Sequence, residues 1–319
     1  EANGFMRWLR GRVGECCDQP LKLNIMYSID GRNDLPEVEL SHLSGYGGAR
    51  PVRIGNGAFD QVQLDIFGEL LDAVYLTNKY GEAISHEGWQ HVTQIVDHVC
   101  VTWQEEDVGI WEMRGEKHHF LHSRLMCWVA LDRAIRLASK RSLPAPFSRW
   151  NETRQEIHTD IWQNFWNAER GHFVQYKGGT ALDGSMLLMP LVRFVAAKDP
   201  AWLATLAAIE KSLVRDGMVY RYRNDDSGLD GLQGTEGAFA ACSFWYVECL
   251  ARAGQVEKAH LEFEQLLRYA NPLGLYAEEF DLYARHLGNT PQALTHLALI
   301  SAASFLDRKL DHQKPQWQP

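Results

Sequence analysis

The spacing of apolar residues along the chain predicts a protein built mainly from helices. Between residues 57 and 76 apolar side chains occur around most of a helical circumference, which is typical of a helix buried on more than one side. The same periodicity predicts helices over residues 87–102, 118–140, 150–165, 186–195, 199–214, 238–253, 255–270 and 291–306. An amphipathic pattern in the first thirteen residues indicates one more helix, and the alternation over Leu21–Tyr27 indicates a strand.

The connections between these helices alternate in length. Short links follow the helices that end near residues 79, 140, 197 and 253. Long loops rich in glycine and aromatic residues occupy residues 20–56, 103–118, 171–185, 215–237 and 271–290. Because the chain reverses direction at each link, we expect the long loops to emerge on one side of a ring of helical hairpins. Six hairpins close such a ring, and the count leaves one hairpin to lie before Glu1.

Composition narrows the functional classes. The 319 residues carry a net charge of −9, which argues against a nucleic-acid partner because such proteins need a clustered basic face. No apolar run reaches the length of about eighteen residues that spans a membrane. The six cysteines lack C-x-x-C spacing and are interpreted as reduced, which favours a cytoplasmic location. Motifs for nucleotides, acyl-transfer nucleophiles and zinc are not found, which disfavours those chemistries.

Two acid-rich stretches lie in the long loops. The stretch Gly109–Arg114, GIWEMR, places Glu112 beside Trp111, and a carboxyl group against an indole is a common arrangement for keeping an acid protonated near neutral pH. The stretch Tyr276–Asp281, YAEEFD, holds Glu278 in a more polar acidic cluster. Two carboxyl groups in different environments suit a general acid and a general base. The alternative is that these acids are solvated surface charges and that Trp111 is a buried loop anchor.

Aromatic residues are concentrated in the same long loops. Flat apolar faces edged by carboxylates and arginines suit the mixed surface of a sugar, whose C–H faces are apolar and whose rim forms hydrogen bonds. Single aromatics of this kind are more often part of a core, and their concentration in the loops is what favours a sugar site. The set comprises Tyr46, Trp103, Trp111, Phe173, Tyr176, Tyr220, Tyr222 and Tyr276.

Four long segments resemble the signature segments of glycoside hydrolase family 15, which contains glucoamylases, glucodextranases and some bacterial trehalases. They follow one another in the family's order over nearly the whole chain. The resemblance implies an all-α (α/α)6 barrel and exo-acting, inverting hydrolysis that releases β-glucose from α-glucosides. The segments are SGYGGARPVRIGN, GIWEMRGEKHHFLHSRLMCWVALDRA, GTEGAFAACSFWYVECLARAG and GLYAEEFDLYARHLGNTPQALTHLALISAA.

The resemblance also implies roles for individual residues. Glu112 matches the general acid, and Glu278, the first Glu of the Ala-Glu-Glu-Phe-Asp segment, matches the general base. If a water molecule lies between the base and the sugar, the two carboxyl groups should be about 6.5–9.5 Å apart. Arg221 with Tyr222, in VYRYR, matches a segment that grips the sugar, and Trp111 matches an aromatic that lines the pocket. The predicted substrate contacts are completed by Arg50, Tyr46 and Tyr276.

The chain departs from the family pattern at its beginning. The family's early N-W-D-Y-R and W-x-R-D-A segment, whose Arg-Asp pair binds outer hydroxyls of the sugar, is not found, and neither is a preceding β-sandwich domain. This agrees with the hairpin count. We therefore expect residues 1–310 to be a catalytic domain truncated at its N-terminus, followed by a polar tail over residues 311–319. We also expect the chain alone to bind substrate weakly.

The leading interpretation is an exo-acting, inverting α-glucoside hydrolase of the glucoamylase type, whose partner is an α-linked gluco-oligosaccharide or disaccharide. This hydrolysis requires neither a metal nor an organic cofactor, and we predict none. Trehalase activity and α-1,6-glucosidase activity, of the glucodextranase or isomaltose type, stay open because the sequence does not determine the linkage. A non-catalytic carbohydrate-binding fragment is a further alternative. A polysaccharide lyase of the same fold is disfavoured, because it more naturally uses a Tyr or His base.

Overall fold

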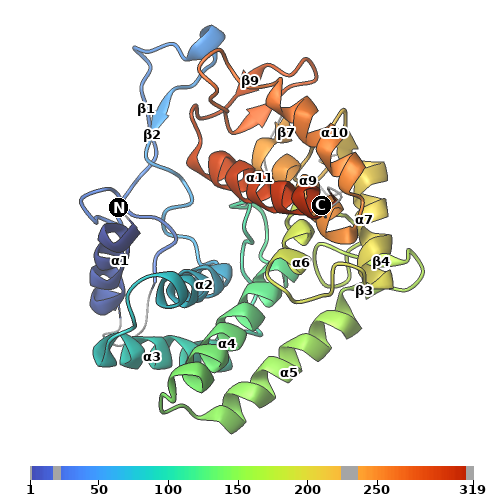
Figure 1. Cartoon of the computed structure of the whole chain (residues 1–319). Helices are drawn as coiled ribbons and strands as arrows, with labels where there is room; N and C mark the ends of the chain where they lie inside the picture. Colours follow the sequence, from blue (N-terminus) through green and yellow to red (C-terminus); the bar gives the residue numbers. More distant parts are fainter. Residues whose placement is uncertain (1, 17–22, 224–235, 314–319) are drawn as a thin grey trace, which may run out of the picture. The chain divides into compact units, whose positions relative to one another are not determined.

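The computed structural model describes residues 2–16, 23–223 and 236–313, and its secondary structure is mainly helical (Figure 1). The chain divides into two compact units, Glu1–Ile161 and Trp162–Pro319. In both units short links join consecutive helices, whereas long irregular connections separate one pair of helices from the next. None of the helices in the described residues is both long and apolar enough to cross a membrane.

The first unit is built around α4 (Leu121–Arg141), which is buried along most of its length and packs against α2 (Asp65–Tyr80). Gly68 allows this packing, because a Cβ atom there would lie 2.3 Å from the backbone oxygen of Met126. α3 (His86–Thr102) contacts both helices. The unit also contains α1 (Ala2–Cys16), the antiparallel pair β1 (Val38–Glu39) and β2 (Arg53–Ile54), the 3-10 helix η1 (Tyr46–Gly48), and most of α5 (Phe147–Asn164).

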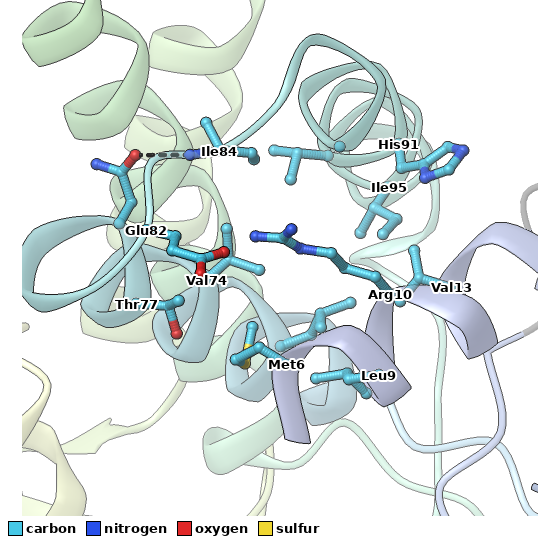
Figure 2. A pocket seen from close by; sticks show the side chains of 14 residues that line it. Met6, Leu9, Arg10, Val13, Val74, Thr77, Glu82, Ile84, His91 and Ile95 are labelled. Atoms are coloured by element: carbon cyan, nitrogen blue, oxygen red, sulfur yellow. Dashed lines mark hydrogen bonds between the residues drawn. The ribbon is translucent and has the colours of Figure 1, made fainter. Parts of the chain in front are cut away.

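Figure 2 shows how α1 is held on the first unit. The side chains of Met6, Leu9 and Val13 face Val74 of α2 and Ile95 of α3 around a cavity of about 40 Å³. The surface of this cavity is almost wholly apolar. Burial of one apolar face of α1 therefore accounts for its position, as the amphipathic pattern of the first thirteen residues predicts.

The second unit is built around α9 (Ala240–Ala253), which is buried along most of its length and packs against α10 (Val256–Leu267) and α11 (Ala293–Gln313). β7 (Ala238–Phe239) leads directly into α9 and pairs with β8 (Glu279–Phe280), which pairs with β9 (His286–Leu287), all antiparallel. The remaining elements are β3 (Trp166–Asn167), β4 (His172–Phe173), η2 (Gly184–Leu187), α6 (Leu188–Leu191), α7 (Pro200–Leu213), β5 (Val214–Arg215) and β6 (Met218–Val219).

Most predicted helices are confirmed to within a few residues. Those over 87–102, 150–165, 199–214, 238–253 and 255–270 correspond to α3, α5, α7, α9 and α10. Local signals set several of their ends. The Asp199 carboxylate caps α7, whose first residue is Pro200, and Gly254 ends α9 in the left-handed conformation with φ of 93°.

The predicted start of the helix at residue 57 is wrong, because α2 begins only at Asp65. Among the eight residues before it, Gly57, Gln61 and Leu64 form long-range hydrogen bonds instead. The Leu64 backbone N–H, for example, donates to the Asp107 carboxylate at 2.8 Å. The helix predicted from residue 118 begins at Leu121, because His118 forms a β-bridge with Asp107 instead.

Four other predictions differ from the structure. The helix predicted over 186–195 is only the short pair η2 and α6, since Pro190 lacks an N–H group and Arg193 adopts a positive φ of 67°. The Leu23–Tyr27 part of the predicted strand has no strand structure, while residues 21 and 22 lie outside the described residues. The long loop predicted over residues 20–56 contains the short elements β1, η1 and β2. The last helix, predicted over residues 291–306, is longer than expected, because α11 continues through Gln313.

Candidate active site

The loop that carries Glu112 is closed at its base by the β-bridge between Asp107 and His118. The bridge consists of two backbone hydrogen bonds of 3.1 and 3.0 Å. At the bend between them Glu112 has a φ of 55°, in the left-handed region that non-glycine residues rarely adopt. Its backbone N–H donates to the Gly109 oxygen at 3.3 Å. The bridge and this turn place the glutamate at the bend of the loop.

Asp107 holds this loop to the helices beneath it. Its carboxylate is 1% exposed and accepts hydrogen bonds from the Leu64 and Gly109 backbone N–H groups and from the Ser123 hydroxyl. Burial raises the pKa of Asp107, and the N–H donors oppose that rise. Glu105 and Glu106, which precede it, are exposed, so Asp107 alone of these three consecutive acids is buried.

The side chains at the bend have separate partners. Trp111 is 9% exposed, as expected of a loop anchor, whereas Glu112 is half-buried. Oε2 of Glu112 accepts a hydrogen bond of 3.0 Å from Nδ2 of Asn56. The backbone oxygen of the next residue, Met113, accepts a hydrogen bond of 3.1 Å from Nε2 of Gln61. Two long loops of the first unit therefore meet at Glu112.

The other predicted contacts of the first unit lie in the loop that contains η1. Tyr46 is 89% exposed, so its ring is open to a ligand. Arg50 is also exposed, and its Nη1 donates to the Ser41 oxygen at 3.4 Å within the same loop. Their predicted contacts with substrate stay a prediction.

Glu278 lies immediately before β8 in the second unit. Its Oε2 accepts hydrogen bonds from the backbone N–H and from Nδ2 of Asn289, both at 3.1 Å. Its backbone N–H donates to the Asn289 oxygen at 3.0 Å. Gly288 leaves room for the carboxylate, because a Cβ there would lie 2.7 Å from Oε2. Since Glu112 and Glu278 belong to different units, the predicted separation of their carboxyl groups stays a prediction.

Arg221 is bound by two carboxylates in the second unit. It donates to Glu236 from Nε and Nη2, at 3.2 and 2.5 Å, and to Glu279 from Nη2 at 3.2 Å. The Tyr222 hydroxyl donates to Glu236 at 3.3 Å. Both Tyr222 and Glu236 line a cavity of about 800 Å³. Tyr222 therefore lines a cavity, and Arg221 contacts Glu279, the residue that follows Glu278.

Several loop aromatics are part of the core instead of offering a face to a sugar. Tyr276 is 2% exposed, its ring packs edge-on against Phe280, and its hydroxyl donates to the Leu266 oxygen at 3.1 Å. It supports the segment that carries Glu278. Trp103 and Phe173 are also buried, so the interpretation of the whole aromatic set as sugar-facing is too broad.

Sequence reasoning missed three partners of the site, Asn56, Asn289 and Glu236. The two asparagines each follow a glycine in a long loop, a pattern that indicates a turn but not which side chain the turn reaches. Glu236 follows Gly234 and Thr235 in the segment GTEG, and nothing in this spacing points to Arg221. Across the described residues no group of three or more His, Cys, Asp or Glu is arranged to hold a metal ion.

We expect Glu279 to lower the stability of the folded protein as the pH rises from about 4.5 to 7. Its ordinary pKa is 4.5, and burial raises it to about 7 in the folded state, opposed by Arg221. Below 4.5 the group is protonated in both states. Above 7 the group is ionised in both states, and the free energy of unfolding is about 3 kcal/mol lower than below 4.5.

Urea unfolding of the protein and of Glu279→Gln over this pH range measures the effect. The stability of the Glu279→Gln variant should not fall in this way, whereas that of the exposed control Glu257→Gln should fall as in the unaltered protein. The same pH dependence in both variants would contradict the assignment to Glu279.

Helices in successive pairs, whose long connections carry hydrogen-bonded glutamates, are the arrangement expected of a glycoside hydrolase built from helical hairpins. The model of the family "Glycosyl hydrolases family 15" matches residues 1–304. The chain belongs to this family, as the resemblance of its four segments predicts.

Comparison with curated proteins finds trehalases. The trehalase of Mycobacterium tuberculosis is 45% identical over 309 residues, which cover 97% of this chain and 45% of that protein. The trehalase of Thermoplasma volcanium is 39% identical over 291 residues, which cover 91% of this chain and 46% of that protein. The chain thus spans about half the length of the curated relatives it matches.

Comparison with solved structures confirms the predicted fold class. A glycosidase in complex with glucose matches with a TM-score of 0.67 and 20% identity, covering 96% of this chain and 80% of that one. A glucoamylase from Saccharomycopsis fibuligera matches with a TM-score of 0.63 and 11% identity, covering 78% and 70%. At these identities the likeness concerns the fold alone.

Proposed function

We propose that the protein to which this chain belongs hydrolyses α,α-trehalose to two molecules of glucose. The observation that carries the proposal is the 45% identity with the trehalase of Mycobacterium tuberculosis over 97% of this chain. The sequence alone favours glucoamylase-like activity, with trehalase as an alternative. The relatives favour the alternative, because the likeness to glucoamylase rests on structures of low sequence identity.

In the proposed reaction Glu112 donates its carboxyl proton to the glycosidic oxygen. Glu278 accepts a proton from a water molecule that attacks the anomeric carbon from the opposite face. The bond between that carbon and the glycosidic oxygen breaks as the new C–O bond forms. One glucose leaves with its α configuration, and the other is formed with the inverted β configuration. We assign substrate binding to Trp111, Arg221, Tyr222, Arg50 and Tyr46.

A substrate panel tests the proposal. Trehalose, maltose and isomaltose are supplied to this chain and to a form extended before Glu1, and the first products are observed by proton NMR. We expect a kcat/KM for trehalose roughly tenfold or more above the others, with equal amounts of α- and β-glucose at early times. A preference for maltose would contradict the proposal. So would binding of trehalose in calorimetry by both forms without turnover, which is the behaviour of a carbohydrate-binding fragment.

A further inference from the structure

We infer that Asn56 is the positioning residue of Glu112 and selects the oxygen of its carboxyl group that carries the transferable proton. Its role in turnover rests on the proposed function, whereas its contact with Glu112 does not. The two side chains come from loops 56 positions apart in sequence, and Nδ2 of Asn56 donates to Oε2 of Glu112 at 3.0 Å.

The orientation of the Asn56 amide follows from its second hydrogen bond. Oδ1 accepts the backbone N–H of Ala58 at 2.8 Å, and a backbone N–H cannot accept a hydrogen bond from an amide nitrogen. The oxygen therefore faces Ala58 and the NH₂ group faces Glu112. The backbone N–H of Asn56 in turn donates to the Leu35 oxygen at 3.0 Å.

Glu37 connects the neighbours of Asn56 with those of Glu112. Its Oε2 accepts the backbone N–H of Gly57 and Nη2 of Arg114, both at 3.2 Å. The Gly57 N–H, followed by the charges of Arg114 and Arg53, holds the pKa of Glu37 below its ordinary value and so favours its ionised form. Gln61 supplies a second connection, because its side chain donates to the Met113 oxygen. The turn after Asn56 and the bend at Glu112 are therefore joined both through Glu37 and through Gln61.

The hydrogen bond assigns different roles to the two oxygens of Glu112. Because Oε2 accepts from an N–H group, the proton of the acid form lies on Oε1. When that proton moves to a leaving group, negative charge develops on the carboxyl, and the Asn56 N–H is already aimed at it. The contact therefore strengthens in the transition state, which is the condition for it to raise kcat.

The charged groups around this bend set the background for a pH experiment. Arg114 follows Glu112 by two residues and is paired with Glu37, which also binds Arg53. The carboxylate of Asp107, at the base of the loop, accepts hydrogen bonds from Leu64, Gly109 and Ser123. A change at Asn56 replaces none of these groups, and Asn56→Ala adds no charge, so a shift in that variant reports the loss of the amide.

The test compares two variants with a matched control. Asn56→Asp keeps the oxygen that accepts the Ala58 N–H but replaces the donor with a like charge, and Asn56→Ala removes both groups. Asn167→Ala is the control, because Asn167 is also half-buried and its Oδ1 also accepts a backbone N–H, that of Arg170 at 3.0 Å. Circular dichroism establishes that each variant is folded.

The first measurement does not require activity. Carbon-13 NMR of labelled glutamate carboxyls, with the Glu112 signal identified by its loss in Glu112→Gln, follows ionisation with pH. Loss of a donor to the ionised form should move the midpoint upward, by about one pH unit in Asn56→Asp and by less in Asn56→Ala. Asn167→Ala should leave it unchanged. An unchanged midpoint in both Asn56 variants would overturn the inference, whatever substrate the enzyme uses.

The second measurement tests the role in turnover. With trehalose, kcat should decrease roughly 10- to 100-fold in Asn56→Asp, with little change in KM, and the basic limb of the pH profile should move to higher pH. A loss confined to KM, or a decrease equal to that of Asn167→Ala, would overturn the positioning role. Absence of trehalose hydrolysis in the unaltered protein would instead refute the proposed function, and the NMR result would stand.

Discussion

Glu112→Gln is expected to lower kcat for trehalose by roughly 10²- to 10⁴-fold while leaving the hydrolysis of α-D-glucosyl fluoride largely intact. The amide oxygen of a glutamine can still accept the hydrogen bond from Asn56, so the bend keeps its geometry. It has no acidic proton for a glucose leaving group, and general acid catalysis is lost. Fluoride leaves without protonation, so the fluoride substrate does not need the acid. Steady-state rates with the two substrates measure the effect.

The control for this prediction is Glu116→Gln. Glu116 is exposed and lies four residues further along the same loop, so the substitution removes a similar charge without changing the carboxyl bound by Asn56. It should retain both activities. If Glu112→Gln kept most of its activity on trehalose, or lost activity on trehalose and on the fluoride equally, Glu112 would not be the proton donor.

The helices could be predicted where one sequence signal dominates. α9 is apolar around its circumference and ends at Gly254, and both features are visible in the sequence. The start of α2 could not be predicted, since the apolar pattern before it is helical while Leu64 is bound by Asp107, 43 positions away. Long-range hydrogen bonds of this kind override local periodicity and leave no trace in it.

The glutamates and their partners differ in the same way. Glu112 and Glu278 stand in long segments that resemble a family, so their roles can be predicted from order along the chain. Asn56 and Asn289 are identified only by the side chains they reach. Burial is equally hidden, because Tyr276 lies in a loop-like segment yet packs in the core of the second unit.

Glu112 in the first unit and Glu278 in the second have the same kind of hydrogen-bond partner. In each, an asparagine side chain donates a hydrogen bond to Oε2 of the glutamate for which we propose a catalytic role. The donors differ in number, since Asn289 supplies both its backbone N–H and its side chain to Glu278, whereas Asn56 supplies only its side chain to Glu112.

Glu278→Ala should lower kcat for trehalose by roughly 10²-fold or more and, unlike Glu112→Gln, should also lose the hydrolysis of α-D-glucosyl fluoride. Both substrates need the base, because water must lose a proton as it attacks. Azide is already an anion and fits the space left by the carboxylate. With added azide the variant should therefore form β-glucosyl azide from the fluoride, as the C–N bond forms and fluoride leaves. Carbon-13 NMR identifies this product. An α-glucosyl azide would indicate attack on the other face, and equal formation by the exposed control Glu257→Ala would remove Glu278 from the role of base.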